Sequence, residues 1–283
     1  MTAQPLPDLD SEAGRGDAEL LEAFGAWLRM RGLSEGTERV YVNAVRRMAA
    51  GTGTRLLEVT PVDLRRWVTD NPSWGPVSVN LARKAAASFY RWAMYEELLD
   101  VDPSAAMPSA RVRQGLPKPV PEDVLAAAIA RADWQGRRIL LLGAYAGLRR
   151  SEIALVHSDN ITAEGLRIVG KGAKTRIVPL HPVLIAELQD VNGWALPSPA
   201  AVDYHPAYGG GHLSANHVAV MAAKWLGGGY STHSLRHRFA TRAYAATHDL
   251  RAVQTLLGHA SVATTQIYVQ VAADSLTAAV MAL

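Results

Sequence analysis

The stretch NITAEGLRIVGKGAKTRIVPL, residues 160–180, differs in pattern from the sequence on either side of it. Apolar and polar residues alternate before and after GKGAK, which is the spacing of half-buried strands. The glycines of GKGAK favour a tight turn between those strands. Helical spacing dominates the rest of the chain, so we predict a mostly α fold with one small β-sheet.

Helical segments surround this predicted hairpin on both sides. Three precede it, and four follow it before a last helix that carries Tyr268. Their predicted ranges are 121–132, 135–147 and 149–156, then 182–190, 214–226, 233–247 and 249–257. We therefore predict an α+β domain over 121–271, followed by an apolar tail over 272–283.

An all-helical domain of four helices is predicted ahead of this domain, over 18–106. The first helix is expected to begin at Ala18. Ser34 and Thr60 are predicted N-caps of the second and third helices, because their hydroxyls can accept from free backbone amides. Gly51 is expected to end the second helix.

Two segments of different composition flank the helical domain. Residues 1–17 are acidic and are predicted to form a flexible head. Residues 107–120 contain several prolines and basic side chains, and proline removes a backbone donor and restrains the chain. We therefore predict a basic, semi-extended linker between the two domains.

Composition limits the kinds of chemistry that are open to the chain. Its 283 residues carry a net charge of +3, which permits a polyanionic partner without requiring one. The absence of cysteine excludes disulfides, thiolate catalysis and cysteine metal sites. The longest strongly apolar run, 139–148, is about half the length of a membrane-spanning helix. With no signal peptide recognised, we expect a soluble, cytoplasmic protein.

Four short motifs hold the polar residues that could carry out chemistry. They are AGLRRSEIALV (146–156), VGKGAKTRIVPL (169–180), HSLRHRFAT (233–241) and LLGHASVATTQIY (256–268). Each motif alone has an ordinary structural interpretation. Arg149 and Glu152 are spaced for a surface ion pair on a helix. His233 and Arg236 share one helix face, and Lys171 is typical of a solvated turn.

Together these residues suit a phosphodiester better than a metal ion. Two arginines, a lysine, two histidines and a tyrosine include no cluster of carboxylates. Paired guanidinium groups stabilise the charge that develops on phosphate oxygens during attack. A tyrosine hydroxyl, with a pKa near about 10, needs a base or a strong positive field to become a nucleophile. We expect a phosphotyrosyl intermediate that is resealed without ATP, and neither a metal nor another cofactor.

In this order and at these spacings, the four motifs closely resemble those of the tyrosine recombinase (phage integrase) family. The resemblance covers 121–270 strongly. It covers 18–104 in architecture, because family members place a four-helix core-binding (SAM-like) domain before the catalytic domain. We expect the compact type of the family, which lacks an arm-binding domain and is Xer-like in layout. The resemblance implies a site-specific DNA recombinase.

The resemblance also implies which residues bind the scissile phosphate. Arg149 and Arg236 would clamp the phosphate, and His259 would donate a hydrogen bond to it. Glu152 matches an acidic position that supports the arginines. His237 matches the family pattern as a structural residue.

Three further residues would carry the covalent step in such an enzyme. Tyr268 would be the nucleophile. Lys171 would act as the general acid toward the 5′ oxygen of the leaving strand. His233 would assist proton transfer at Tyr268.

Family members clamp DNA between their two domains, so basic residues of both domains are candidate DNA contacts. These are Arg46, Arg47, Arg65, Arg66, Arg83, Lys84, Arg91, Arg111, Arg113, Lys118, Lys174 and Arg176. Such contacts position a protein on DNA without specifying sequence. The alternative for about half of them is a simple role in solvating helix surfaces.

Three functions are open on the sequence alone. The first is a phage or mobile-element integrase, and the second is a Xer-type recombinase that resolves chromosome or plasmid dimers. The third is a DNA-binding regulator that keeps the scaffold without cleaving. For either recombinase, the family implies double-stranded attachment or core sites and a tetrameric synapse. The tail 272–283 would dock on a neighbouring protomer, and a directionality factor is a further expected partner.

Overall fold

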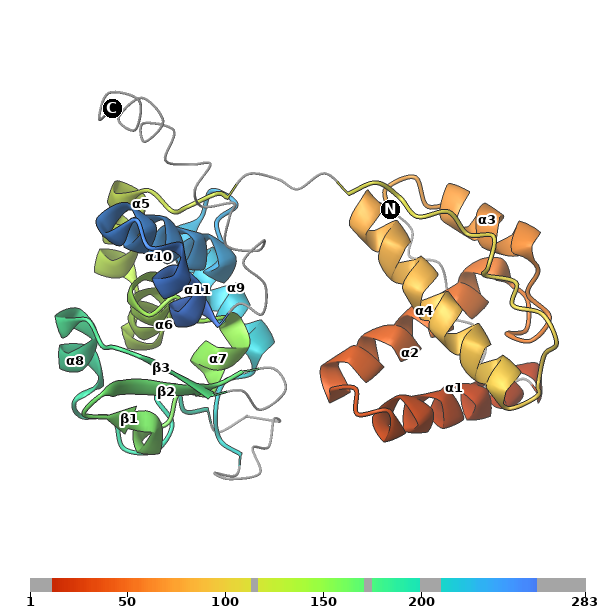
Figure 1. The fold of residues 1–283 in the computed structure, drawn as a ribbon, viewed down its shortest axis with the longest axis horizontal. Coiled ribbons are helices and arrows are strands. Elements are labelled where there is room, and N and C mark those ends of the chain that lie inside the picture. The colour runs from red at the N-terminus through yellow and green to blue at the C-terminus, as the bar shows by residue number, and fades with distance from the viewer. Residues whose placement is uncertain (1–11, 113–116, 171–174, 199–209, 259–283) are drawn as a thin grey trace. The chain divides into compact units, whose positions relative to one another are not determined.

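The computed structural model of the chain describes residues 12–112, 117–170, 175–198 and 210–258 (Figure 1). The chain divides into two compact units, Met1–Gln114 (unit 1) and Gly115–Leu283 (unit 2). This division lies inside the segment 107–120 that the sequence predicts as a linker. Both units are built mainly from helices, and no helix within the described ranges is long and apolar enough to cross a membrane.

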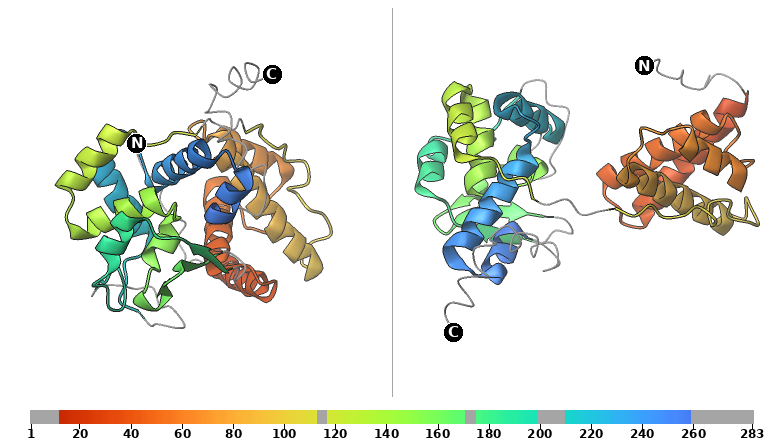
Figure 2. Two further views of the ribbon diagram at one scale, coloured as in Figure 1. Left: turned by 60° about the vertical axis from the view of Figure 1, so that its left-hand side comes forward. Right: turned by 90° about the horizontal axis from the view of Figure 1, so that it is seen from above.

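Four helices make up the described part of unit 1. They are α1 (Glu12–Met30), α2 (Glu35–Thr52), α3 (Pro61–Thr69) and α4 (Pro76–Tyr95). α2 packs against each of the other three, and Figure 2 shows this bundle from two further directions. The Ser34 hydroxyl accepts from the Thr37 amide, and Thr60 forms a capping box with Asp63. Both predicted N-caps are therefore confirmed.

The core of unit 1 is rich in aromatic side chains. Phe24 of α1 meets Phe89 of α4 edge to face, with ring centroids 5.4 Å apart, and Trp92 packs beside both. Tyr90 is fully buried, and its hydroxyl donates to the Leu56 carbonyl oxygen at 3.1 Å. Because aromatic rings bury large apolar areas, these contacts join α1 to α4 by apolar packing.

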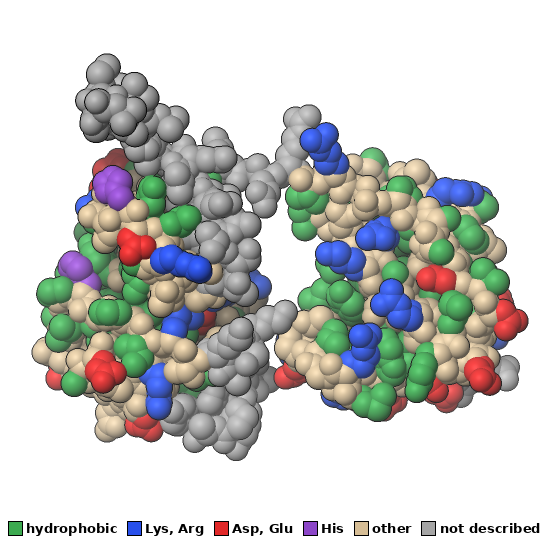
Figure 3. All heavy atoms as spheres, viewed as in Figure 1, with side chains coloured by type: hydrophobic (Ala, Val, Ile, Leu, Met, Phe, Trp, Pro, Cys, Tyr) green, Lys and Arg blue, Asp and Glu red, His purple; other side chains and the backbone are tan. Residues whose placement is uncertain are grey.

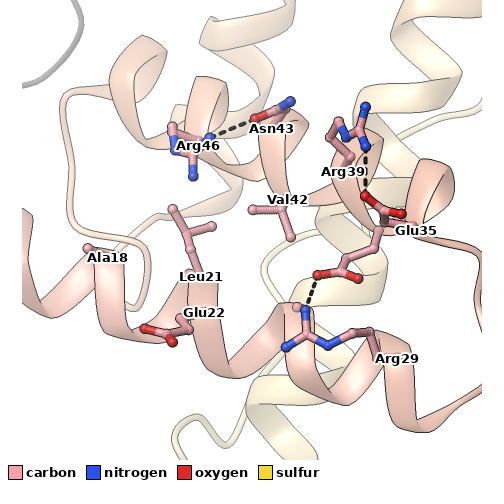
Figure 4. A pocket seen from close by; sticks show the side chains of 11 residues that line it. Ala18, Leu21, Glu22, Arg29, Glu35, Arg39, Val42, Asn43 and Arg46 are labelled. Carbon is pink, nitrogen blue, oxygen red and sulfur yellow. Dashed lines mark hydrogen bonds and ion pairs between the residues drawn. The ribbon is translucent and has the colours of Figure 1, made fainter. Parts of the chain in front are cut away.

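A surface pocket of about 450 Å³ lies between α1 and α2 (Figure 4). Three arginines that line it are each bonded to a neighbour: Arg29 to Glu38, Arg39 to Glu35 and Arg46 to Asn43. Two of these neighbours are carboxylates. The pocket therefore carries paired charges rather than a one-sided positive field.

The start of α1 differs from the sequence prediction. The helix begins at Glu12 and not at Ala18, so part of the predicted flexible head is helical. A tertiary contact accounts for this difference. The carboxylate of Asp17 accepts from the Leu56 amide at 3.3 Å, which ties the first turns of α1 to the rest of unit 1.

The end of α2 also differs from the prediction. The helix continues through Gly51, whose Cα lies so close to the Trp67 ring that an added Cβ would be 2.3 Å from it. Gly51 thus serves packing rather than termination. The helix ends instead at Gly53, which has a left-handed φ of 65°.

Unit 2 combines helices with a small antiparallel sheet of three strands, β1 (Ile161–Thr162), β2 (Gly165–Val169) and β3 (Thr175–Val178), in that order. The described helices are α5 (Glu122–Arg131), α6 (Trp134–Tyr145), α7 (Arg150–Ala154), α8 (Pro182–Leu188), α9 (Ala215–Leu226), α10 (Thr232–Thr247) and α11 (Leu250–Leu257), with a short 3₁₀ helix at Ser158–Asn160. The predicted fold class, mostly α with a small sheet, is confirmed.

Packing in unit 2 brings β3, α10 and α11 next to one another. Leu166 of β2 pairs with Val178 of β3, and both are buried in the main core with residues of α6 and α8. α10 crosses α6 where Leu235 lies against Gly143. α11 then packs on both α10 and β3. The sheet and these two helices together position the polar residues of the predicted motifs.

Candidate active site

The turn that leads into α7 holds Arg149 and Glu152 in a fixed arrangement. Gly147 has a φ of 64°, and a Cβ there would lie 2.4 Å from the Phe239 ring, so only glycine fits. The Arg149 amide donates to Oε2 of Glu152 at 2.9 Å, and its guanidinium donates to Oε1 at 2.8 Å. The side chain of Glu152 is 5% exposed. The carboxylate of this pair is therefore buried, while the Arg149 side chain stays partly exposed.

Two further arginines, from other elements, lie next to the Glu152 carboxylate. Arg176 of β3 donates to both carboxylate oxygens, at 2.9 and 2.8 Å. Nη1 of Arg236, on α10, lies 3.8 Å from Oε2. Burial alone would raise the pKa of Glu152, but hydrogen bonds from Arg176 and Arg149 and their charges outweigh it and lower that pKa. Glu152 is therefore an ionised anchor for all three guanidinium groups.

Arg236 is almost fully enclosed, with its side chain 2% exposed, whereas that of Arg149 is 41% exposed. The guanidinium of Arg236 donates to the carbonyl oxygen of Gly147 at 2.7 Å and to that of Leu257. Its position is thus set by the same turn that carries Arg149. Three guanidinium groups around one carboxylate leave an excess of positive charge, which suits an anionic ligand.

The same three arginines bind the end of α11. Arg176 donates to the carbonyl oxygen of Leu256 at 2.8 Å, Arg236 to that of Leu257, and Arg149 to that of Gly258 at 3.4 Å. The last carbonyl oxygens of a helix receive no hydrogen bond from the helix itself. α11 also has no basic residue in its own last turn that could supply one. Arginines from three other parts of the chain therefore bond to the carbonyl oxygens at the end of this helix. His259 follows directly in the sequence.

Two histidines on α10 lie beside this cluster. The rings of His233 and His237 meet edge to face, with centroids 4.2 Å apart. Burial, followed by His233 and Arg236, lowers the pKa of His237 to about 4. Although much of His233 is exposed, its ring is partly buried, and this burial lowers its pKa. The positive charges of Arg236 and Arg149 lower that pKa further. A neutral His233 can accept a proton at neutral pH.

The structure thus brings together four of the predicted site residues. Arg149, Glu152 and Arg236 meet directly, and His233 is close enough for both arginines to lower its pKa. Several predicted residues lie outside the described part of the chain: Lys171, His259 and Tyr268 of the site, and Arg113 and Lys174 of the DNA contacts. Among the described residues, no group of three or more His, Asp or Glu side chains is arranged to hold a metal ion.

Arg176 has an environment that differs from the one predicted. Its side chain is 9% exposed and bonded to Glu152 and Leu256, which does not fit a direct contact with DNA phosphate. β3 also reverses the usual pattern, because Arg176 points inward while Ile177 is 41% exposed. The alternation of apolar and polar residues in this strand therefore did not indicate that Arg176 would be buried.

Unit 1 carries most of the remaining predicted DNA contacts at its surface. Figure 3 shows Lys and Arg side chains gathered on the face that carries α4. The exposed ones among the predicted contacts are Arg47, Arg65, Arg66, Lys84, Arg91 and Arg111. Arg46 and Arg83 are half-buried. In unit 2, Lys118 is exposed but donates to the Gly228 carbonyl oxygen at 3.3 Å.

A second buried arginine of α10 has no counterpart among the predicted site residues. Arg238 donates to both carboxylate oxygens of Glu122, at 2.9 and 2.7 Å, and to the Ala144 carbonyl oxygen at 3.0 Å. These bonds fix α10, and with it Arg236 and His233, against α5 and α6. Glu122 lies 116 residues earlier in the chain, so no local pattern could have indicated the pair.

Comparison with known proteins identifies the same two parts of the chain. The model of the phage integrase family matches residues 121–275, and that of the phage integrase N-terminal SAM-like domain matches residues 20–100. Tyrosine recombinase XerC of Methylobacterium sp. (strain 4-46) is 35% identical over 294 residues, covering 90% of this chain and 91% of the relative. Tyrosine recombinase XerC of Mycobacterium leprae (strain TN) is 32% identical over 292 residues, covering 91% and 96%.

Solved structures share the fold at lower identity. A lambda integrase dimer bound to a COC′ core site has a TM-score of 0.65 at 20% identity, covering 89% of this chain and 76% of that chain. XerH site-specific recombinase bound to palindromic difH substrate has a TM-score of 0.65 at 18% identity, covering 99% of both chains. From the family match and the relatives, the protein belongs to the phage integrase family and is a tyrosine-type site-specific DNA recombinase.

Proposed function

We propose that the protein cuts and rejoins DNA through a covalent 3′-phosphotyrosyl link to Tyr268. The observation that carries this proposal is the meeting of Arg149 and Arg236 at the buried carboxylate of Glu152. Two guanidinium groups are thereby held close together before a substrate binds. Such fixed positive groups stabilise the charge that develops on a transferring phosphoryl group.

In the proposed reaction, the Tyr268 hydroxyl attacks the scissile phosphorus and the 5′ oxygen leaves. The two arginines and His259 would bind the non-bridging oxygens. Lys171 would donate the proton that the 5′ oxygen needs, and His233 would take the proton from Tyr268. The phosphotyrosyl ester keeps the energy of the broken bond, so a 5′ hydroxyl can reverse the step without ATP.

The substrate and the assembly are proposed from structures of similar fold. These include a lambda integrase tetramer bound to a Holliday junction, with a TM-score of 0.63, and the XerH complex with difH substrate. They support double-stranded core sites as the substrate and a tetrameric synapse as the working assembly. Exposed basic residues of unit 1 would contact the backbone. A cytoplasmic location follows if the substrate is genomic DNA, and a directionality factor would be a further partner.

A covalent-adduct assay tests the proposal. DNA that flanks the gene is cloned onto a plasmid, incubated with the protein in EDTA without ATP, and quenched with detergent. We expect a 3′-linked protein–DNA adduct from the wild type and none from Tyr268→Phe. Tyr95→Phe is the matched control, because it removes one hydroxyl from an exposed tyrosine of unit 1. Specific binding without an adduct in all three proteins would instead support a non-catalytic regulator.

A second role within the same reaction class is the resolution of chromosome or plasmid dimers. The similarity to two XerC proteins over 90% or more of the chain favours it beside integration. A plasmid assay separates the roles. Resolution predicts recombination between two copies of one site, with a second recombinase present, whereas integration predicts recombination between two different attachment sites by this protein alone.

A further inference from the structure

Arg176 occupies an unusual position for a strand residue next to a glycine-rich turn. It faces the interior of unit 2 and uses three nitrogen atoms as donors. Nε donates to the Leu256 carbonyl oxygen at 2.8 Å, Nη1 to Oε1 of Glu152 at 2.9 Å, and Nη2 to Oε2 at 2.8 Å. A single planar group therefore joins β3, α7 and the end of α11.

We propose that Arg176 is a positioning residue for DNA cleavage, which holds Glu152, and through it Arg149, in register with the end of α11. The proposal rests on the function proposed above for Arg149. Arg176 itself does not touch DNA, because its side chain is 9% exposed and its bonds are made within the protein. It acts by fixing groups that do.

The carboxylate of Glu152 is fully used by this arrangement. Oε1 accepts from the guanidinium groups of Arg149 and Arg176, and Oε2 accepts from the Arg149 amide and from Arg176. Loss of Arg176 removes two of these four hydrogen bonds from a buried charge. The carboxylate must then take up a proton or turn toward Arg149 and Arg236, and either change moves the Arg149 guanidinium.

The site requires an arginine rather than any basic residue. The two parallel bonds to Glu152 need a planar fork, and the third bond needs Nε on the opposite side. Gly258 fits against this plane, since a Cβ there would lie 3.0 Å from Nη1, and its φ is 62°. Lysine offers a single nitrogen, so it cannot reproduce donation from three separate nitrogen atoms.

Single-turnover cleavage at saturating protein, with DNA affinity and melting temperature measured in parallel, tests the proposal. We expect Arg176→Lys and Arg176→Ala to slow cleavage about tenfold to a hundredfold, because small displacements of positioned groups have effects of that size. DNA affinity should stay within about twofold. Arg167→Ala is the matched control, because Arg167 lies exposed on the neighbouring strand β2. This variant should cleave at the wild-type rate.

A double-mutant cycle shows whether Arg176 acts through Glu152. If it does, Arg176→Ala combined with Glu152→Gln should lose no more activity than the worse single variant. Additive losses, or wild-type cleavage by both Arg176 variants with only a lower melting temperature, would overturn the proposal. An adduct formed by the wild type and by Arg167→Ala establishes the proposed function independently of either result.

A titration that needs no DNA gives a second test. The Glu152 carboxyl is followed by NMR in the wild type and in Arg176→Lys, both at temperatures where the protein is folded. Glu152 faces Arg149, Arg176 and Arg236, and the proposal expects its pKa to rise in the variant because burial then has less opposition. An unchanged titration would show that Arg176 does not hold this carboxylate, whatever the cleavage assay reports.

Discussion

Two groups of arginines, one in each unit, have opposite environments. In unit 1, Arg47, Arg65, Arg66 and Arg91 lie exposed on helices over an apolar core, and no charged residue is buried among the described positions of that unit. In unit 2, Arg236 and Arg238 are themselves buried. One residue type thus serves two purposes within the chain.

Exposed and buried arginines are suited to different tasks, namely attracting DNA and fixing the position of a bound phosphate. An exposed arginine keeps its rotational freedom and attracts phosphate from a distance, but it specifies little about the position of a bound atom. A buried arginine must be fully hydrogen-bonded, because an unpaired buried charge is costly. The bonds that satisfy Arg236 also fix where it lies. Unit 1 is therefore suited to holding DNA, and unit 2 to aligning one phosphate.

The largest effect is expected from a buried arginine of unit 2. Arg236→Ala should lower the rate of adduct formation about 10²–10³-fold, the usual loss for one fixed charge donor. Arg91→Ala in unit 1, at saturating DNA, should leave that rate unchanged. Single-turnover cleavage of a core-site duplex measures both. Equal rates in the two variants would remove the distinction between the units and the proposed phosphate clamp.

A smaller effect concerns stability at acid pH. The pKa of His237 is about 4 in the folded protein, below its ordinary value of 6.5, so the unfolded chain takes up the proton first. The free energy of unfolding should therefore be undiminished above pH 6.5 and fall as the pH is lowered toward 4. His233, with its pKa also lowered, adds to this fall. Denaturant unfolding at several pH values measures it.

Replacement of the buried histidine tests this assignment. His237→Gln should lower stability above pH 6.5 through lost packing, and it should reduce the slope between pH 6.5 and 4, so that its deficit relative to the wild type shrinks as the pH falls. Below this window, protonation of Glu152 and Glu122, whose pKa values are lowered, destabilises both proteins alike. A slope in the variant as steep as in the wild type would contradict the prediction.

The smallest effect is expected from single charges on unit 1. Lys84→Gln and Arg91→Gln should each reduce the slope of log Kd against log salt by about one. Cleavage at saturating DNA should not change. Binding titrations between low and moderate salt measure the slope, with Glu97→Gln, at the end of α4, as a control that removes an exposed charge of opposite sign. An unchanged slope would place these two residues outside the DNA interface.

Local sequence signals predicted the fold where the interaction itself is local. Ser34 and Thr60 cap helices because their partners are three residues away. Gly51 was misassigned because a stop signal and a close packing site look alike in sequence, and Trp67 decides between them. The start of α1 likewise depends on Leu56, which is distant in sequence from Asp17.

In the candidate site, too, local interactions were predicted from the sequence and contacts between distant residues were not. The spacing of Arg149 and Glu152 indicated a pair, but not that Glu152 would be buried and would also meet Arg176 and Arg236. Arg176 was predicted to contact DNA as one of the basic residues of a family that clamps DNA, and its partner Glu152 lies 24 residues earlier. Residues that act through distant partners carry no local signal. The predicted roles of Lys171, His259 and Tyr268 stay predictions.

The way α11 ends has a consequence for the protein during its synthesis. The ribosome makes Arg149, Glu152, Arg176 and Arg236 before it makes Leu256, Leu257 and Gly258. Until those carbonyls emerge, three guanidinium groups face one carboxylate without the acceptors that hold them in the finished protein. We therefore expect the cluster of three arginines around Glu152 to take its final form only after the end of α11 has been made. A nascent chain would then acquire the ability to cut DNA only after the end of α11 has been made.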